Sequence, residues 1–125
     1  MIFLCKFMYF YAIFDVDKII NIYYNQNMDF EKIPEKYRED IKKASILLKN
    51  EGCQSVYLFG SMITGNIHQN SDIDIGIKGL PAKKYFRTYA LLDKELTNRI
   101  DLVDFDLHKD FYDLLSSLEE VTEIG

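Results

Sequence analysis

The segment Asp72-Ile73-Asp74-Ile75-Gly76-Ile77 constrains the fold more than any other part of the chain. Side chains on a β-strand point alternately to opposite faces, so this alternation predicts a strand with both aspartates on one face and the isoleucines on the other. The isoleucine face must be covered by other elements if it is to leave water. We therefore expect a sheet with one buried face and one face that carries chemistry.

Periodic and apolar segments on either side predict the rest of the fold. Pro34 and Gly52 bracket a segment with apolar residues at three- and four-residue steps, which predicts a helix. Further predicted elements are a strand at 56–59, a helical turn at 61–65, a helix at 82–98, a strand at 100–105 and a helix at 111–120. The side chains that the helix at 82–98 is expected to bury are Tyr85, Phe86, Tyr89, Leu92 and Leu96. The result is an α+β (α/β-like) fold, a small mixed β-sheet covered by helices, with the strand order left open.

Chain length and charge limit the substrates. With 125 residues the chain has room for one domain but not for an additional acceptor-binding domain. Its formal net charge of -5 disfavours a long nucleic acid as substrate, because such binders gain affinity from faces rich in Lys and Arg. The two cysteines, Cys5 and Cys53, match no metal-ligand spacing and no disulfide framework, which favours a cytoplasmic location.

Residues 1–27 differ in composition from the rest of the chain. They are rich in Ile, Phe, Tyr and Asn and contain no Gly or Pro, as in translated AT-rich DNA. We interpret residues 1–27 as a spurious extension and expect residues 28–125 to form the domain, with a genuine N-terminal element as the alternative. Lys6 interrupts the apolar stretch at 1–14, which is shorter than the about 20 residues of a membrane span, so membrane insertion is not expected.

The aspartates of the alternating strand are suited to bind cations. Asp72 and Asp74, with a third carboxylate from a neighbouring strand, could hold one or two hard divalent ions, and Asp101 is the best third candidate. An isolated Asp-x-Asp pair is more often a solvated strand edge, but this pair follows a Gly60-Ser61 turn. In such a turn the glycine backbone, the serine hydroxyl and the amide groups at the start of the following helix can all lie close to an anion such as a triphosphate.

Three segments carry a family resemblance. They are LFGSMITG at 58–65, SDIDI at 71–75 and IDLVD at 100–104. In this order they resemble the minimal nucleotidyltransferases of the DNA polymerase β superfamily, which include MntA-like antitoxins, and the likeness spans roughly residues 32–125. The resemblance implies a polymerase β-type nucleotidyltransferase fold and transfer of a nucleoside monophosphate, with AMP from ATP as the expected case.

The resemblance also assigns roles by motif. It implies that Gly60 and Ser61 bind the nucleotide phosphates and that Asp72, Asp74 and Asp101 bind magnesium, with two Mg²⁺ ions expected. Asp101 would in addition help to activate the attacking hydroxyl. In phosphoryl-type transfer the protein mainly positions the reactants and stabilises their charge, and this set of residues is suited to both tasks.

Two features depart from the family pattern. Many members carry arginine just after Gly-Ser, so one expected phosphate contact is missing here. The residues at those positions are Met62, Ile63 and Thr64. Candidate replacements are Lys83, Lys84 and Arg87, although a solvated helix face is the favoured interpretation for them. The family also tends to continue into a short terminal strand, whereas this chain stops at Gly125, so we expect that strand to be absent and the reading frame to be truncated or frameshifted.

The remaining polar and aromatic candidates are expected to lie outside the site. Asp104 and Asp106 fall on the strand face opposite Asp101 and are expected at the surface or behind the site. His68 is expected to be exposed in a loop, and the tyrosines of the helix at 82–98 are expected in the core instead of forming a nucleobase platform.

Members this small resemble the antitoxin half of a two-gene pair. In that pair the nucleotidyltransferase transfers AMP to a tyrosine of a helical HEPN-type toxin, so we expect ATP and a HEPN-type toxin as partners. One alternative is a non-catalytic antitoxin that neutralises its partner by binding; the missing arginine favours it and the intact carboxylates oppose it. A second is a small-molecule nucleotidyltransferase of the aminoglycoside type, which the chain length disfavours. The sequence leaves the acceptor, the nucleotide preference and the oligomeric state open.

Overall fold

A four-stranded mixed sheet forms the centre of the part of the chain that the computed structural model describes, residues 30–125. The strands are β1 (Ser55–Phe59), β2 (Ile73–Lys78), β3 (Ile100–Asp104) and β4 (Val121–Glu123). Their order in the sheet is β3-β2-β1-β4, with β2 parallel to β3 and β1 antiparallel to both β2 and β4. The predicted α+β class is confirmed, whereas the interpretation of residues 1–27 lies outside the described range.

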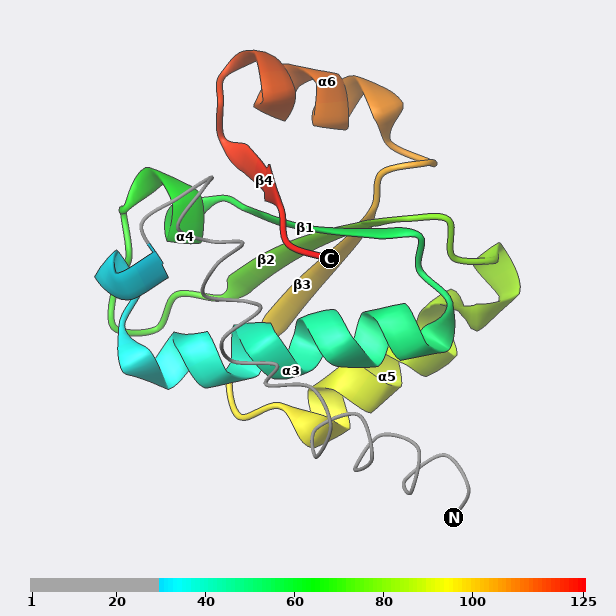
Figure 1. The fold of residues 1–125 in the computed structure, drawn as a ribbon, viewed down its shortest axis with the longest axis horizontal. Coiled ribbons are helices and arrows are strands. Elements are labelled where there is room, and N and C mark those ends of the chain that lie inside the picture. The colour runs from blue at the N-terminus through cyan, green and yellow to red at the C-terminus, as the bar shows by residue number, and fades with distance from the viewer. Residues whose placement is uncertain (1–29) are drawn as a thin grey trace.

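Helices lie on both sides of this sheet. They are α3 (Glu35–Glu51), α4 (Ser61–Thr64), α5 (Tyr85–Glu95) and α6 (Lys109–Ser117), with short 3-10 turns at Phe30–Lys32 and Ala82–Lys84. Helices α3 and α5 pack side by side against one face of the sheet, and α6 lies over the other face (Figure 1). The larger core therefore lies between the sheet and the pair α3 and α5.

Helix α3 begins and ends where its flanking residues predict. It follows Pro34 directly, and Gly52 ends it in a left-handed conformation with φ 112°. The Gly52 amide donates to the carbonyl groups of Leu48 and Lys49, which satisfies the end of the helix. Ile41 and Leu48, on its apolar stripe, are fully buried, so this stripe fixes the helix on the sheet.

Strand β2 has the two faces that its alternation predicts. Ile73, Ile75 and Ile77 are fully buried in the core against α3 and α5, whereas Asp74 is half-buried on the opposite face. Two residues beyond Asp74 on that face, a side chain at Gly76 would collide with the ring of Phe105, because an added Cβ would lie 2.0 Å from it.

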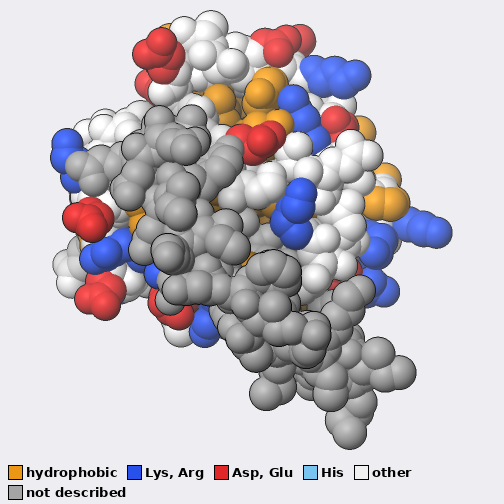
Figure 2. All heavy atoms as spheres, viewed as in Figure 1, with side chains coloured by type: hydrophobic (Ala, Val, Ile, Leu, Met, Phe, Trp, Pro, Cys, Tyr) orange, Lys and Arg blue, Asp and Glu red, His pale blue; other side chains and the backbone are white. Residues whose placement is uncertain are grey.

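A second, aromatic cluster fills this part of the sheet beneath α6. Its buried members are Tyr57, Phe59, Phe105 and Leu115. Hydrophobic side chains gather beneath α6 in the face drawn in Figure 2, where Lys and Arg are interspersed with Asp and Glu. Asp74 and the aromatic cluster thus lie next to each other on the same face of the sheet.

The predicted burial of Phe86 is wrong, because this side chain is 82% exposed. The neighbouring tyrosines set the orientation of α5: the Tyr85 hydroxyl donates to the Leu102 carbonyl and the Tyr89 hydroxyl donates to the Ile100 carbonyl. Both acceptors belong to the edge strand β3, so these bonds turn Phe86 outward. The prediction of Tyr85 and Tyr89 as packing residues is confirmed in part, since both are half-buried and also protect the edge of the sheet.

The expected absence of a terminal strand is also wrong. Val121–Glu123 forms β4, which pairs with β1 so that Val121 lies opposite Phe59 and Glu123 lies opposite Tyr57. This strand is only three residues long and has two polar side chains, so it has no pattern that distinguishes it from a loop.

Two further expectations concern the membrane and the cysteines. Within residues 30–125, no helix combines the length and the apolar character that a membrane span requires. Cys53 is buried and free, and burial raises the pKa of its thiol to about 11, which disfavours the reactive thiolate.

Candidate active site

The three predicted carboxylates lie together at one end of the sheet. Asp74 on β2 and Asp101 on β3 are direct neighbours in the parallel register, and Asp72 lies one residue before β2. Alternation places all three side chains on the face opposite the buried isoleucines. The fold thus gathers residues that are far apart in the sequence.

The carboxylates interact unfavourably with one another. The pKa of Asp74 rises from its ordinary value of 3.8 to about 6, first because burial removes solvent and then because the charges of Asp101 and Asp72 lie nearby. Among residues 30–125, no donor forms a hydrogen bond with the Asp74 carboxylate that would offset this cost. A charge cluster without compensation is typical of a site that binds a cation.

The donor set suits magnesium, although the oxygens are not yet gathered around a common point. In the described part of the chain, no three His, Cys, Asp or Glu side chains are arranged closely enough to hold a metal ion as they stand. Carboxylate oxygens are nevertheless the ligands that Mg²⁺ prefers, and Asp74 and Asp101 are direct neighbours in the register of β2 and β3. The chemistry of the donors therefore fits a divalent cation.

The Gly60-Ser61 turn lies directly against Asp74. Gly60 has φ 71° and ψ -142°, and a Cβ at this position would lie 2.1 Å from Asp74 Oδ2. Any residue other than glycine would be strained in this conformation and would force the Asp74 carboxylate to shift. Ser61 begins α4, and its hydroxyl has no hydrogen-bond partner within the described residues. The turn and the carboxylates form one continuous site.

A buried aspartate that the sequence analysis missed positions this site. Asp40 of α3 is 2% exposed and accepts hydrogen bonds from the backbone amides of Thr97 and Asn98 and from both of their side chains. These bonds hold the loop that leads into β3, and therefore the strand that carries Asp101. Its helical position on α3 gave no signal, because its partners are 57 and 58 residues away.

Arg99 is the second residue that the sequence analysis missed. Its Nε lies 3.9 Å from Asp72 Oδ2, and its side chain is 83% exposed. It shares a strand face with Asp101, two residues later, so alternation could have identified it. Both Asp72 and Arg99 line a shallow hollow of about 310 Å³ beside the carboxylates.

The other candidate cations lie elsewhere. Lys83 and Arg87 are exposed, in agreement with the favoured interpretation of a solvated helix face, and Arg87 lies 3.0 Å from Glu51 on α3. Lys84 departs from this interpretation, because it is half-buried and lies 3.8 Å from Glu51. His68 is exposed, as expected.

The two acidic residues after Asp101 stay outside the carboxylate site. Asp106 is exposed and accepts a hydrogen bond from the Gly79 amide. Asp104 lies on the face opposite Asp101, as expected, yet only 7% of it is exposed.

Comparison with known proteins identifies the family of the chain. The family model described as "Polymerase beta, Nucleotidyltransferase" matches residues 39–117, a span that includes the Gly-Ser turn and all three carboxylates. The chain belongs to this family of nucleotidyltransferases. The family match and the structural neighbours together make it a minimal nucleotidyltransferase of the polymerase β superfamily.

Two solved structures resemble the chain over most of its length. One, titled "Crystal structure of the toxin-antitoxin with AMP-PNP", is 26% identical with a TM-score of 0.56 and covers 74% of this chain and 73% of its own. The other is a toxin-antitoxin MntA-HpeT mutant with two Asp-to-Glu substitutions two positions apart; it is 25% identical with a TM-score of 0.53 and covers 70% and 71%. No protein of curated function matches the sequence.

Proposed function

We propose that the protein transfers AMP from ATP to a hydroxyl of a protein partner, and that it acts as the antitoxin of a toxin-antitoxin pair. The observation that carries this proposal is the placement of Asp74 and Asp101 in register, with Asp72 just before β2 and the glycine-serine turn against Asp74. One neighbour's title names a toxin-antitoxin with AMP-PNP, an ATP analogue, and the other's names substitutions of two aspartates spaced like Asp72 and Asp74.

Each residue of the site has a role in this proposal. Asp72, Asp74 and Asp101 hold Mg²⁺, with two ions expected, and Gly60 and Ser61 contact the phosphates through backbone and hydroxyl. When bound, magnesium would neutralise charge on the phosphates and on the departing pyrophosphate. The open Ser61 hydroxyl and the close approach that Gly60 allows support the phosphate contact.

The transfer step needs a base as well as position. The acceptor oxygen attacks the α-phosphorus, the bond from that phosphorus to the bridging oxygen breaks, and pyrophosphate leaves. The acceptor proton passes to a carboxylate oxygen of Asp101, which is exposed and faces solvent at the open side of the site. The half-buried Asp74 is less accessible to an acceptor.

Arg99 supplies the positive charge that the segment after Gly-Ser lacks. Its only ion pair among residues 30–125 is the long, exposed one with Asp72, so it can leave that partner at little cost when a nucleotide binds. A guanidinium is suited to this role because its fork of N–H donors matches phosphate oxygens.

A protein acceptor explains why the site is open. Asp101 is exposed, so a hydroxyl carried by another protein could reach it. We propose a tyrosine of a helical HEPN-type toxin as the acceptor. A tyrosine hydroxyl, with a usual pKa near 10, is mostly protonated at neutral pH, so removal of its proton by Asp101 matters for the rate.

A second candidate function is neutralisation by binding alone. It is favoured by large exposed hydrophobic side chains, which could bind a partner without any catalysis. The two most exposed are Phe86 and Leu107, at 82% and 72%.

Intact-mass spectrometry of the partner distinguishes the two functions. The protein is mixed with the product of the neighbouring reading frame, ATP and Mg²⁺, and the partner should gain the mass of AMP. The Asp72→Asn variant, which keeps size but removes a ligand charge, should leave the mass unchanged, whereas Asp93→Asn on the outer face of α5 should behave like the wild type. Tight binding without any change of mass would replace the enzymatic proposal by neutralisation through binding.

A further inference from the structure

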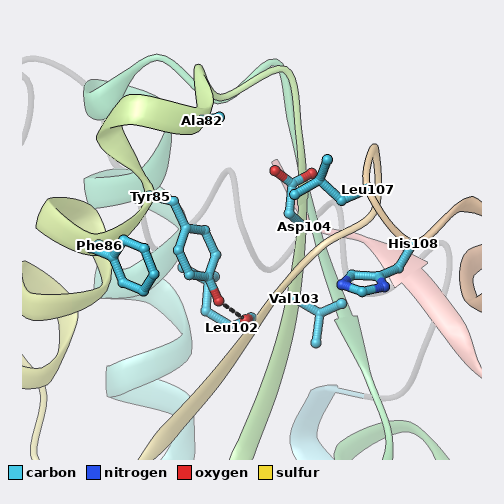
Figure 3. A pocket seen from close by; sticks show the side chains of 8 residues that line it. All are labelled: Ala82, Tyr85, Phe86, Leu102, Val103, Asp104, Leu107 and His108. Carbon is cyan, nitrogen blue, oxygen red and sulfur yellow. Dashed lines mark hydrogen bonds between the residues drawn. The ribbon is translucent and has the colours of Figure 1, made fainter.

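A hollow of about 380 Å³ lies at the free edge of β3, away from the Gly-Ser turn. The first turn of α5 forms one wall and the turn after β3 forms the other (Figure 3). Residues that define it are Tyr85, Phe86, Leu102, Asp104, Leu107 and His108. The proposed function makes no use of this hollow.

The rim of the hollow is apolar and exposed. Phe86 is 82% exposed and Leu107 is 72% exposed, and they stand on the two elements that form its walls. Two large hydrophobic side chains facing solvent across a hollow are typical of a surface that another molecule covers. Their positions therefore mark an entrance.

A buried acid lies inside this entrance. Asp104 is 7% exposed, and its carboxylate faces the hollow in Figure 3. Its Oδ1 accepts one hydrogen bond, from the Asp106 amide at 2.9 Å. The ion pairs found among residues 30–125 join Glu51 to two cations and Asp72 to Arg99, so none of them involves Asp104.

Burying a carboxylate without a cation is costly. The residues that line the hollow indicate which occupant would offset this cost. The occupant needs a positive charge at its tip and an apolar stem that can lie against Phe86 and Leu107. Lysine and arginine side chains have this construction. A neutral apolar side chain would leave the charge of Asp104 without a countercharge, and a phosphate would be repelled.

We infer that this pocket docks a lysine or arginine side chain of the partner protein and so places the partner along β3. The inference rests on the proposed function, because it supplies the anchor for that partner. Asp104 and Asp101 are three residues apart on one strand, which separates them by roughly 10 Å. A partner anchored at Asp104 would therefore extend across the edge of the sheet to the carboxylate site, where its hydroxyl is needed.

Calorimetric titration of the full chain with the product of the neighbouring reading frame tests this inference. Asp104→Asn keeps an oxygen for the Asp106 amide but removes the charge, and Phe86→Ser removes an exposed ring without touching the core. Each should weaken binding about tenfold or more. The matched controls, Asp93→Asn and Leu118→Ser, change an exposed acid and an exposed hydrophobic residue outside the hollow and should stay within about twofold of wild type.

The outcomes separate docking from catalysis. Equal affinity of all variants would overturn the pocket but leave the transfer reaction in place, and equal weakening by the controls would overturn it too. Self-association of the chain that Asp104→Asn abolishes would show a second copy as the occupant and likewise overturn it. If the wild type does not bind the partner at all, docking and the partner proposal fail together, whereas binding of ATP with Mg²⁺, measured separately, still reports on the nucleotide site.

Discussion

Asp40 and Asp74 have the same side chain but very different surroundings in two regions of this molecule. Asp40, between α3 and the loop before β3, is 2% exposed and accepts four hydrogen bonds from Thr97 and Asn98. Asp74, on the open face of β2, is half-buried, accepts none from residues 30–125, and lies beside two further carboxylates that help to raise its pKa to about 6.

This difference distinguishes an aspartate that stabilises the fold from an aspartate of the candidate active site. A buried acid with a full set of donors stabilises the fold, because its desolvation is offset by charge-assisted hydrogen bonds. A half-buried acid next to like charges destabilises the fold until a cation arrives. The two regions are nevertheless connected, since the Asp40 loop holds the start of β3 and with it Asp101.

Replacing Asp40 by Ala should give the largest loss of stability. The change leaves the backbone amides of Thr97 and Asn98 without their partner, and we expect the free energy of unfolding to fall by about 3 kcal/mol or more. Urea denaturation measures it, with the exposed Asp93→Ala as control, expected within about 0.5 kcal/mol of wild type. A loss as small as that of the control would mean that the loop does not depend on Asp40.

Gly60→Ala should have the next largest effect, and Gly65→Ala is its matched control. Both glycines have positive φ, 71° and 85°, so both substitutions introduce strain. Only at Gly60 does the new methyl group meet a neighbour, Asp74 Oδ2 at 2.1 Å, whereas nothing lies within 4 Å at Gly65. We expect Gly60→Ala to cost about 2 kcal/mol more than Gly65→Ala in thermal or chemical denaturation. Equal costs would mean that the turn does not press on the carboxylate.

Asp74→Asn should stabilise the metal-free protein, which is opposite in sign to the Asp40 variant. The folded-state pKa of about 6 exceeds the ordinary 3.8, so the folded protein holds the proton more tightly and wild-type stability falls as the pH rises through this window. The variant should therefore match wild type near the lower value and exceed it above the upper one. We expect a gain of about 1 kcal/mol at most, because solvent screens this half-exposed group.

Denaturation of both proteins in EDTA between pH 4 and pH 7.5 measures this gain. Added Mg²⁺ and ATP should then stabilise only the wild type. A variant less stable than wild type throughout the range would show that Asp74 is a structural acid like Asp40.

Arg99→Gln should have the smallest effect on stability, within about 0.5 kcal/mol, because its ion pair with Asp72 is long and exposed. The same change should raise the KM for ATP several-fold if Arg99 contacts the phosphates. Arg87→Gln, which loses a contact with Glu51 on the other side of the sheet, should leave the KM unchanged. An equal KM for both variants would remove Arg99 from the nucleotide site.

Local patterns predict one of the two regions much better than the other. The alternation around Asp72 and Asp74 and the Gly-Ser turn are contiguous in sequence, so their geometry can be read from strand and turn rules. The Asp40 interactions cannot, because they join residues nearly sixty positions apart.

The same reason accounts for the elements that sequence reasoning missed. Phe86 fits a helical stripe, but the orientation of α5 depends on tyrosine hydroxyls that reach the distant strand β3. Strand β4 is too short to show a periodic hydrophobic pattern. It forms because the edge of β1 is available for backbone pairing.

The central claim is that the carboxylate face binds a nucleotide together with magnesium, and calorimetric titration of ATP in the presence and absence of Mg²⁺ tests it most directly. The wild type should bind ATP only with Mg²⁺. Asp72→Asn and Asp74→Asn should each lose this binding while melting as folded proteins, and Asp101→Asn should bind yet transfer poorly. Asp93→Asn should bind like wild type. If both Asp72→Asn and Asp74→Asn bind ATP with unchanged, magnesium-dependent affinity, the carboxylate face is not the nucleotide site.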